Sequence, residues 1–263
     1  MWLPLSCMQC STEHLKSGGA LEDYNAEWIP CEISDDGIYR AECRSGHPIR
    51  VILQSLKHEL LFESGAAAML LGFRREAVTS YQVALERFFE LGIKVFLKAQ
   101  GVPDKDVDQA WKPIAHQSER QLGAFLQLYL ATFKEPFQNI EDLARLRNQV
   151  VHKGYIPTNA EAVAFGRRVY DIIETTQLRF EKELTEPFEM ICRQPMAKAA
   201  SQLYESGEAP RRVDDGWMGP TTMYFPMALS HVQKRESART FDDAMREIER
   251  RLPTYGHRRP PSA

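Results

Sequence analysis

The chain has 263 residues, of which 43% are hydrophobic, and it carries a formal net charge of −3. This length and composition predict a folded core with one main domain and appendages. The slightly negative charge excludes a generally basic nucleic-acid coat, so any contact with RNA or DNA requires a local basic patch.

Membrane insertion and export are not expected. No run approaches the roughly 18 apolar residues that a membrane span needs, and the first ten residues lack the basic start and long apolar stretch of a signal peptide. We therefore expect a cytoplasmic protein. Five cysteines, an odd number, favour reduced thiols or a metal site over a disulfide framework.

Residues 1–47 read as a small cysteine-rich β-hairpin module. They contain four of the five cysteines, and the turn-forming residues 35–37 stand between Trp28-Ile29 and Ile38-Tyr39. A short Asp/Gly turn between β-branched and aromatic residues is typical of a hairpin.

Four residues of this module have the spacing of a structural zinc site. Cys7 and Cys10 form a C-x-x-C pair, and Cys43 with His47 can form the second half across the hairpin, as in a zinc ribbon. Four protein ligands leave no open position, so such an ion would be structural. The looser second pair and the left-over Cys31 leave free thiols as the alternative.

Residues 48–184 predict a mainly α protein, an antiparallel bundle of four or five helices, because apolar residues recur there at helical spacing. The expected helices run from Pro48 to Gly72, through Val78 to Gly101, over about 104–133 with a bend at Pro113, from Asn139 to Gly154, and from Thr158 onward. Asn139 can cap the fourth helix, and Thr158 with Glu161 predicts a capping box for the fifth.

Residues 185–263 have a different character. Eight of the fifteen prolines fall there. Only one further helix, at about 240–252, is indicated by apolar spacing, and the last residues are expected to be disordered.

The candidate catalytic residues are Arg147, Asn148 and His152, near the end of the fourth helix. Arginine supplies a permanent forked cation that matches a phosphate. Histidine can accept and return a proton near neutral pH, and the negative end of the helix dipole favours its protonated form. The alternative interpretation is that the first two are ordinary surface residues and that His152 caps the helix.

RNA cleavage needs little beyond these groups, because the 2′-hydroxyl of the substrate is the nucleophile. A base, an acid and a cation that stabilises the phosphorane are sufficient without a metal ion. Residues 143–153 contain no carboxylate, which disfavours a two-metal nuclease. Arg145 and Lys153 add positive charge there and are candidate RNA-binding residues.

The geometry of one helix predicts an incomplete site. Asn148 and His152 are four residues apart and share a face, whereas Arg147 and His152 are five apart and point about 140° away from each other. A distorted last turn, a neighbouring helix or a second subunit must therefore complete the site. A two-fold dimer would supply one histidine as base and another as acid.

The segment LRNQVVHKGYIPTNAEA resembles the HEPN superfamily and its Arg-x4–6-His motif, and the resemblance covers roughly residues 50–183. It implies a metal-independent endoribonuclease with a composite site at a homodimer interface, acting in phage defence as a toxin or in RNA turnover. Arg147 would bind the scissile phosphate, His152 would transfer protons, and Asn148 would orient the histidine or the hydroxyl.

The expected products are 2′,3′-cyclic phosphate and 5′-hydroxyl ends. RNA, a second copy and a regulatory partner or antitoxin are the implied partners, with no cofactor for catalysis. The alternative is a non-catalytic HEPN-like RNA-binding or protein-interaction module. Glu86 and Glu90 could reach the site, but solvated helix carboxylates are the favoured interpretation.

Overall fold

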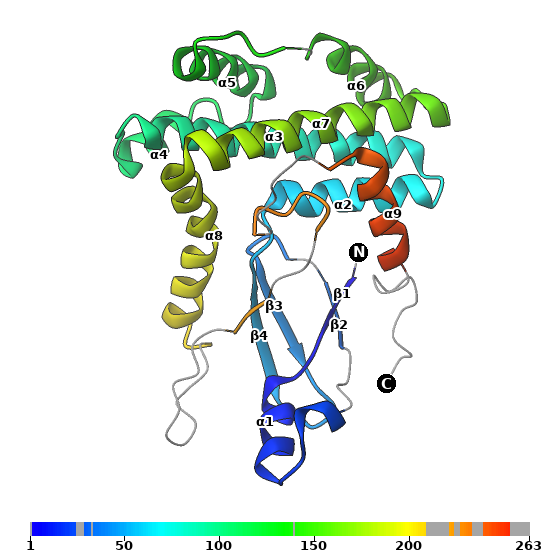
Figure 1. Ribbon diagram of the computed structural model, residues 1–263, viewed down its shortest axis with the longest axis vertical. Coiled ribbons are helices and arrows are strands. Elements are labelled where there is room, and N and C mark those ends of the chain that lie inside the picture. The colour runs from blue at the N-terminus through cyan, green and yellow to red at the C-terminus, as the bar shows by residue number, and fades with distance from the viewer. Residues whose placement is uncertain are drawn as a thin grey trace. The chain divides into compact units, whose positions relative to one another are not determined.

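The computed structural model describes residues 2–24, 29–32, 34–138, 140–208, 221–223, 227–232 and 239–252. Within them the fold is mainly helical with small sheets built chiefly from N-terminal strands, which confirms the predicted fold class (Figure 1). No helix in this described part has the length and apolar character that crossing a lipid bilayer requires.

The chain divides into two compact units. The described residues of the sheet unit fall within Met1–Gln54, Pro195–Phe225 and Arg250–Ala263, and those of the helical unit within Ser55–Gln194 and Pro226–Glu249. The first boundary thus lies after Gln54, a few residues beyond the position that the sequence suggests.

The sheet unit contains two small sheets, two short helical segments and the second half of a longer helix that is described below. Its elements are β1 (Trp2–Leu5), α1 (Met8–Lys16), the 3-10 helix η1 (Leu21–Asp23), β2 (Ile29–Glu32), β3 (Ile38–Glu42), β4 (Pro48–Leu53) and β5 (Thr221–Met223). Strands β1 and β2 pair antiparallel, whereas β3, β4 and β5 form the second sheet with β5 parallel to β4.

The predicted hairpin is shifted along the chain. Strands β2 and β3 flank residues 35–37, but each pairs with another strand, and the hairpin is formed by β3 and β4 around the turn at 43–47. Trp28 lies outside the described residues. The turn signal was read correctly, but it does not specify which strands pair, because pairing depends on contacts with more distant segments.

The helix expected from Pro48 is also corrected, because Pro48–Leu53 is strand β4. Three of its residues, Ile49, Val51 and Ile52, are β-branched and favour an extended backbone. Their apolar side chains are buried on both faces of the strand, which removes the alternation that would distinguish it from a helix.

The helical unit contains α2 (Lys57–Leu70), α3 (Arg74–Ala99), α4 (Asp104–Trp111), α5 (Ser118–Phe133), α6 (Glu141–Lys153), α7 (Asn159–Glu183) and most of α9 (Phe241–Arg251). The region 104–133 is two helices, because the chain turns at 112–117 around Pro113. Thr158 and Glu161 form the predicted capping box of α7. Asn139, the predicted cap of α6, lies outside the described residues.

Helix α8 (Thr185–Glu205) was not expected, since the prolines of this region favoured an irregular extension. Pro187 lies in its first turn, where no intrahelical donor is lost, and Pro195 marks the boundary between the two units. In the sheet unit, Ala199 and Leu203 of α8 pack against Ile38 and Ile52. The predicted helix at 240–252 is present as α9, and residues 253–263 lie outside the described part.

A single buried ring organises the centre of the helical unit. Tyr81 of α3 is completely buried, and its ring lies against Gly65 of α2 and Gly166 of α7. A Cβ atom would lie 2.8 Å from the ring at Gly65 and 2.6 Å at Gly166. Both positions therefore require glycine, and the three helices approach closely at this point.

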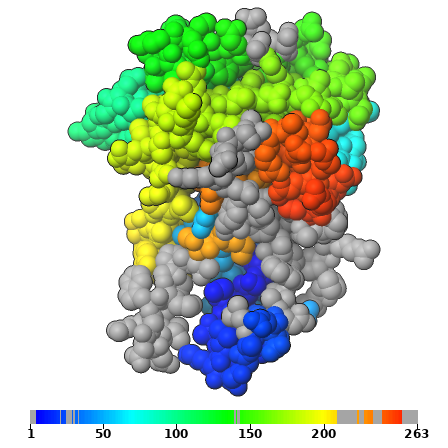
Figure 2. Space-filling view, viewed as in Figure 1, coloured from blue at the N-terminus to red at the C-terminus, as the bar shows by residue number. Residues whose placement is uncertain are grey.

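Helix α9 lies against α7 (Figure 2). Arg167 forms two hydrogen bonds with the Asp242 carboxylate, at 2.9 and 2.7 Å, and stacks over the Phe241 ring at 5.0 Å. Ala244 and Ile248 are completely buried. A narrow apolar face thus attaches an otherwise charged helix.

Buried carboxylates attach Ala228, His231 and Arg239 of the C-terminal segment to the bundle. Glu59 accepts hydrogen bonds from the His231 backbone N–H at 2.8 Å and pairs with His231 Nδ1 at 2.7 Å, while its other oxygen accepts from Leu56 N at 3.0 Å. Glu63 accepts from Ala228 N and Glu174 from Arg239 N. Each carboxylate is at most 2% exposed and accepts a hydrogen bond that a backbone N–H group would otherwise donate to water.

We expect Glu59→Ala to lower the free energy of unfolding by about 2–4 kcal/mol, because buried donors lose their acceptor. Chemical denaturation followed by the helical circular dichroism signal measures this. Glu76→Ala, at an exposed position of α3, is the control and should change stability by less than about 0.5 kcal/mol. Equal effects of the two substitutions would contradict the buried role of Glu59.

Candidate functional site

The polar residues singled out in the sequence lie on the last turns of α6. Leu143 and Val150 are buried and hold one face of the helix against the rest of the unit. Gly154 follows with a left-handed φ of +67° and ends the helix, as predicted. The apolar face thus fixes α6 and leaves Arg147 and His152 near its surface.

Arg147 contacts both other candidate catalytic residues. Its Nη1 atom donates a hydrogen bond to Asn148 Oδ1 at 2.9 Å and lies 3.3 Å from His152 Nε2. The expected separation of Arg147 and His152 does not occur. The angle of about 140° describes where the side chains leave the helix, whereas a long arginine can extend along the helix to the next turn.

Two other helices hold the second edge of the Arg147 guanidinium. Its Nη2 atom lies 3.6 Å from Glu86 Oε1 on α3 and 3.5 Å from Ser118 Oγ at the start of α5. Gln82, one turn before Glu86, donates to the same carboxylate oxygen at 2.9 Å. The Arg147 and Glu86 side chains are only 22% and 16% exposed, so water screens this ion pair only partly.

The favoured interpretation of Glu86 and Glu90 as solvated carboxylates is corrected. Glu90 pairs with Arg87 at 2.6 Å and Lys94 at 2.8 Å, and its side chain is 20% exposed. Helical periodicity identified which residues of α3 are apolar. It contains no information on which polar residue of another helix Glu86 meets, so only the fold reveals the contact with Arg147.

Arg145, Asn148 and Lys153 are exposed on α6, as is His152. Within the described residues, neither Arg145 nor Lys153 forms an ion pair. The end of α6 therefore presents two exposed cationic side chains, at the positions where the sequence predicts RNA-binding residues.

This arrangement suits acid–base chemistry beside an anion. Because the guanidinium donates, His152 Nε2 is the acceptor in the contact with Arg147, and Nδ1 then carries the proton of the neutral ring. Nη2 is occupied by Glu86 and Ser118, whereas Nη1 faces His152 and Asn148. A phosphate oxygen that approached Nη1 would lie next to a proton-transfer group.

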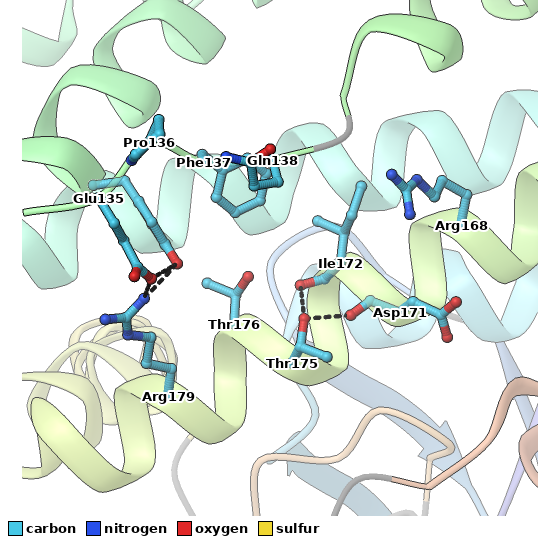
Figure 3. A pocket seen from close by; sticks show the side chains of 11 residues that line it. Glu135, Pro136, Phe137, Gln138, Arg168, Asp171, Ile172, Thr175, Thr176 and Arg179 are labelled. Carbon is cyan, nitrogen blue, oxygen red and sulfur yellow. Dashed lines mark hydrogen bonds and ion pairs between the residues drawn. The ribbon is translucent and has the colours of Figure 1, made fainter. Parts of the chain in front are cut away.

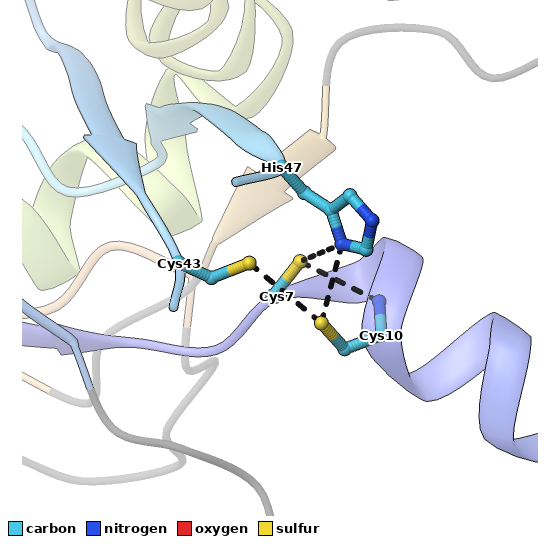
Figure 4. A group of neighbouring side chains, drawn as sticks. All are labelled: Cys7, Cys10, Cys43 and His47. Carbon is cyan, nitrogen blue, oxygen red and sulfur yellow. Dashed lines mark hydrogen bonds between the residues drawn. The ribbon is translucent and has the colours of Figure 1, made fainter. Parts of the chain in front are cut away.

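A second cluster lies in the sheet unit, where Cys7, Cys10, Cys43 and His47 bring one potential ligand atom each within 4.8 Å of one another (Figure 4). Cys10 Sγ is 3.7 Å from Cys43 Sγ and 3.2 Å from His47 Nδ1, and Cys7 Sγ is 3.7 Å from His47 Nδ1. Ligand atoms around a tetrahedral ion lie about 3.4–3.8 Å apart. These four residues, which the sequence selected, could hold a structural metal ion.

Local backbone structure places the four side chains. Cys7 is the N-cap of α1, and its sulfur accepts a hydrogen bond from Cys10 N at 3.5 Å. Cys43 and His47 close the turn between β3 and β4 through a Cys43 N–H to His47 O bond of 3.2 Å. Gly46 has a φ of +78° in this turn, a conformation that favours glycine.

The surroundings of the cluster fit a bound cation. Burial raises the pKa of Cys7 to about 11 in the absence of an ion. Burial also acts on Cys43, but backbone N–H groups of His47 and Ser45 outweigh it and lower the pKa of that thiol. Glu13 lies 3.4 Å from His47 Nε2, which leaves Nδ1 facing the sulfurs. N–H groups that stabilise thiolate and a carboxylate behind the histidine are typical of metal sites.

The remaining cysteines, Cys31 and Cys192, are buried and do not belong to this cluster. Cys31 Sγ lies 3.8 Å from the carbonyl oxygen of Arg40. Burial raises the pKa of both thiols, as it does for Cys7, so what sets Cys31 and Cys192 apart is that neither belongs to a group of potential ligands among the described residues.

Comparisons with protein-family models, with curated proteins and with solved structures find no match to this chain. The chemistry of the Arg147 cluster and of the Cys/His cluster is therefore the basis for assigning a function.

Proposed function

We propose that this protein is a metal-independent endoribonuclease of the HEPN type, with Arg147, Asn148 and His152 at its active site. The observation that carries the proposal is that Arg147 Nη1 contacts both Asn148 Oδ1, at 2.9 Å, and His152 Nε2, at 3.3 Å. A fixed cation beside a proton-transfer group is what a phosphodiester requires when the 2′-hydroxyl is the nucleophile.

In the proposed reaction, the substrate enters between Arg147 Nη1 and His152 Nε2 and replaces their contact. His152 Nε2 then accepts the proton of the 2′-hydroxyl as the 2′-oxygen attacks the phosphorus. Arg147 Nη1 stabilises the negative charge on the non-bridging oxygens, and Asn148 orients the histidine or the hydroxyl. The bond from phosphorus to the 5′-oxygen breaks, and an acid protonates that oxygen. The products are a 2′,3′-cyclic phosphate and a 5′-hydroxyl, and no water is consumed.

Glu86 and Ser118 act as positioning residues in this scheme. They hold the Nη2 edge of Arg147 from two other helices and so direct Nη1 toward His152. The same ion pair favours the second candidate function, a non-catalytic RNA-binding or protein-interaction module. In that reading the Glu86 carboxylate competes with phosphate for Arg147, while Arg145 and Lys153 bind the backbone of an RNA strand.

The proposed acid is His152 of a second copy of the chain. Val151, Tyr155 and Ile156 are 38%, 38% and 65% exposed and follow or flank His152 in sequence. Exposed apolar side chains beside a polar cluster are typical of a contact surface, and a two-fold contact would place both histidines in one cleft. A nuclease of this kind needs restraint in the cell, which is the role proposed for a regulatory partner.

We expect His152→Ala to lower kcat/KM for single-stranded RNA by about 10²–10⁴-fold, because proton transfer is lost. Arg147→Lys keeps the charge but loses the fork, and should cost about 10²-fold. Gel analysis of labelled RNA with and without EDTA, together with analysis of the product ends, measures both effects. Zinc content is determined after the EDTA treatment, so that loss of a structural ion is not mistaken for loss of catalysis.

Arg193→Ala is the matched control, since this side chain of α8 is 73% exposed and pairs only with Glu189 in the described part of the chain. It should cleave like the wild type. Cleavage that survives His152→Ala overturns the catalytic assignment. RNA binding without any cleavage by the wild type supports the non-catalytic alternative.

Dimerisation and cleavage should be lost together in Ile156→Asp. A charge at this exposed apolar position disfavours burial against a second copy. Sedimentation equilibrium and the same RNA assay measure the two properties. Met190→Asp, at another exposed apolar position of the helical unit, is the control and should remain dimeric and active. A monomeric wild type that cleaves RNA would contradict the composite site.

We propose that the Cys/His cluster binds zinc. Three thiolates and one imidazole form a set of soft and borderline ligands that zinc prefers, and four ligands complete its tetrahedral shell. Such an ion stabilises the sheet unit, because it joins α1 to the turn between β3 and β4. It has no catalytic part in the proposed RNA cleavage.

The purified protein should contain about one zinc ion per chain, measured by plasma mass spectrometry. In Cys10→Ser the zinc content should fall to background, and amide protection of residues 34–54 should be lost, since the ion contributes folding free energy. Cys31→Ser, at a buried cysteine outside the cluster, should retain the metal. Full zinc occupancy in Cys10→Ser would rule out this ligand set.

A further inference from the structure

The helical unit contains a pocket of about 550 Å³ that the proposed nuclease site does not use (Figure 3). It lies between α7 and the segment 135–138, which leads from α5 toward α6. Its size falls within the range of roughly 300–1,000 Å³ that is usual for sites of small organic ligands.

The floor of the pocket contains a side-chain hydroxyl that has no hydrogen-bond partner among the described residues and is open to the pocket. Thr176 is 4% exposed, and within the described residues its hydroxyl forms no hydrogen bond. Its neighbour Thr175 donates to the carbonyl oxygen of Asp171 at 2.6 Å, as helical threonines commonly do. Figure 3 shows the Thr176 hydroxyl directed toward the loop on the other side of the pocket. A hydrogen-bonding ligand would satisfy this group.

The charges that line the pocket balance. Arg168 and Arg179 contribute two positive charges, and Glu135 and Asp171 contribute two negative ones. Arg179 is held in place by its ion pair with Glu135 and by a 2.6 Å hydrogen bond to the Tyr129 hydroxyl. A balanced set of donors and acceptors favours a neutral ligand that carries both kinds of group over a simple anion.

Apolar groups form part of both walls. Ile172 of α7 is buried at 5% exposure, and Pro136 and Phe137 lie on the loop side. A flat ring can lie against such surfaces, and the Thr176 hydroxyl and the Gln138 amide, which line the same pocket, can form hydrogen bonds with its edge. Carboxylate, amide and hydroxyl groups are also those that read the edges of bases.

We propose that this pocket binds an unpaired nucleobase, either of an RNA strand or of a free nucleoside. The proposal deepens the proposed function, because a base held here would give the nuclease a sequence preference. Only the choice of RNA as the source of the base depends on the proposed nuclease function. Burial raises the pKa of the Asp171 carboxyl, and the charges of Arg167 and Arg168 oppose this shift.

The four ribonucleosides are the probes, each titrated into the full-length protein at millimolar concentration and followed by saturation-transfer NMR. At least one should bind. Thr176→Val keeps the shape of the side chain but removes its hydroxyl, and should weaken binding about 3–10-fold. Thr175→Val is the matched control, because that hydroxyl is already bonded to the helix backbone, and its binding should stay within about 2-fold of wild type.

Both variants are first checked for wild-type circular dichroism and melting temperature. Absence of binding for all four nucleosides, or equal affinity of wild type and Thr176→Val, overturns the proposal. A panel of free amino acids is titrated in parallel, and tighter binding of an amino acid than of any nucleoside overturns it as well.

Short oligoribonucleotides of the preferred base distinguish the two sources. Tighter binding than the nucleoside, lost in Thr176→Val, assigns the pocket to an RNA strand, whereas equal affinity assigns it to a free nucleoside. Nucleoside binding by a wild type that never cleaves RNA would leave the pocket assignment intact and remove only the nuclease function. Cleavage of RNA by a wild type that binds no nucleoside would overturn the pocket assignment and leave the nuclease function intact.

Discussion

The close approach of three helices around Tyr81 is the constraint on which the helical unit depends. The ring fits only because Gly65 and Gly166 have no side chains, and it fixes α3 between α2 and α7. Helix α3 then carries Glu86 to Arg147, and α7 carries Thr176 to the floor of the pocket. A substitution that leaves a cavity or causes a clash at this ring would therefore displace both Glu86 on α3 and Thr176 on α7.

The two clusters are built in different ways. Around the cysteines, a helix cap places Cys7 and Cys10 and a five-residue turn places Cys43 and His47, and the fold of the sheet unit brings these two pairs together. Around Arg147, three helices that are distant in sequence each supply a partner. Within the first cluster each pair of ligands depends on local backbone conformation, whereas the second cluster depends throughout on the packing of helices.

This difference explains how much could be predicted from the sequence. Gly154, Thr158 and Glu161 act through neighbouring residues, and the end of α6 and the start of α7 were predicted correctly. The four cysteine and histidine residues were also identified from the sequence as candidate ligands, because the spacing within each pair reflects a local turn. Residues 48–53 were wrongly predicted as helix, because their strand conformation depends on pairing with β3, which the local sequence does not reveal.

The candidate site could be predicted only in part, for the same reason. Arg147, Asn148 and His152 lie within six residues, so their chemistry was visible in one segment. The roles of Glu86 and Thr176 could not be predicted. Glu86 contacts Arg147 of a helix that is distant in sequence, and Thr176 faces the distant segment 135–138. Helix α8 was missed because its prolines outweighed a short apolar pattern.

The order of the chain has a consequence for how the protein forms during synthesis. The segments that build the sheet unit are separated by nearly the whole helical unit, so Ile38 and Ile52 meet Ala199 and Leu203 only after most of the protein has left the ribosome. By contrast, the Cys/His cluster is complete once His47 has emerged. An ion captured at that stage would hold a nascent hairpin until its remaining packing partners arrive.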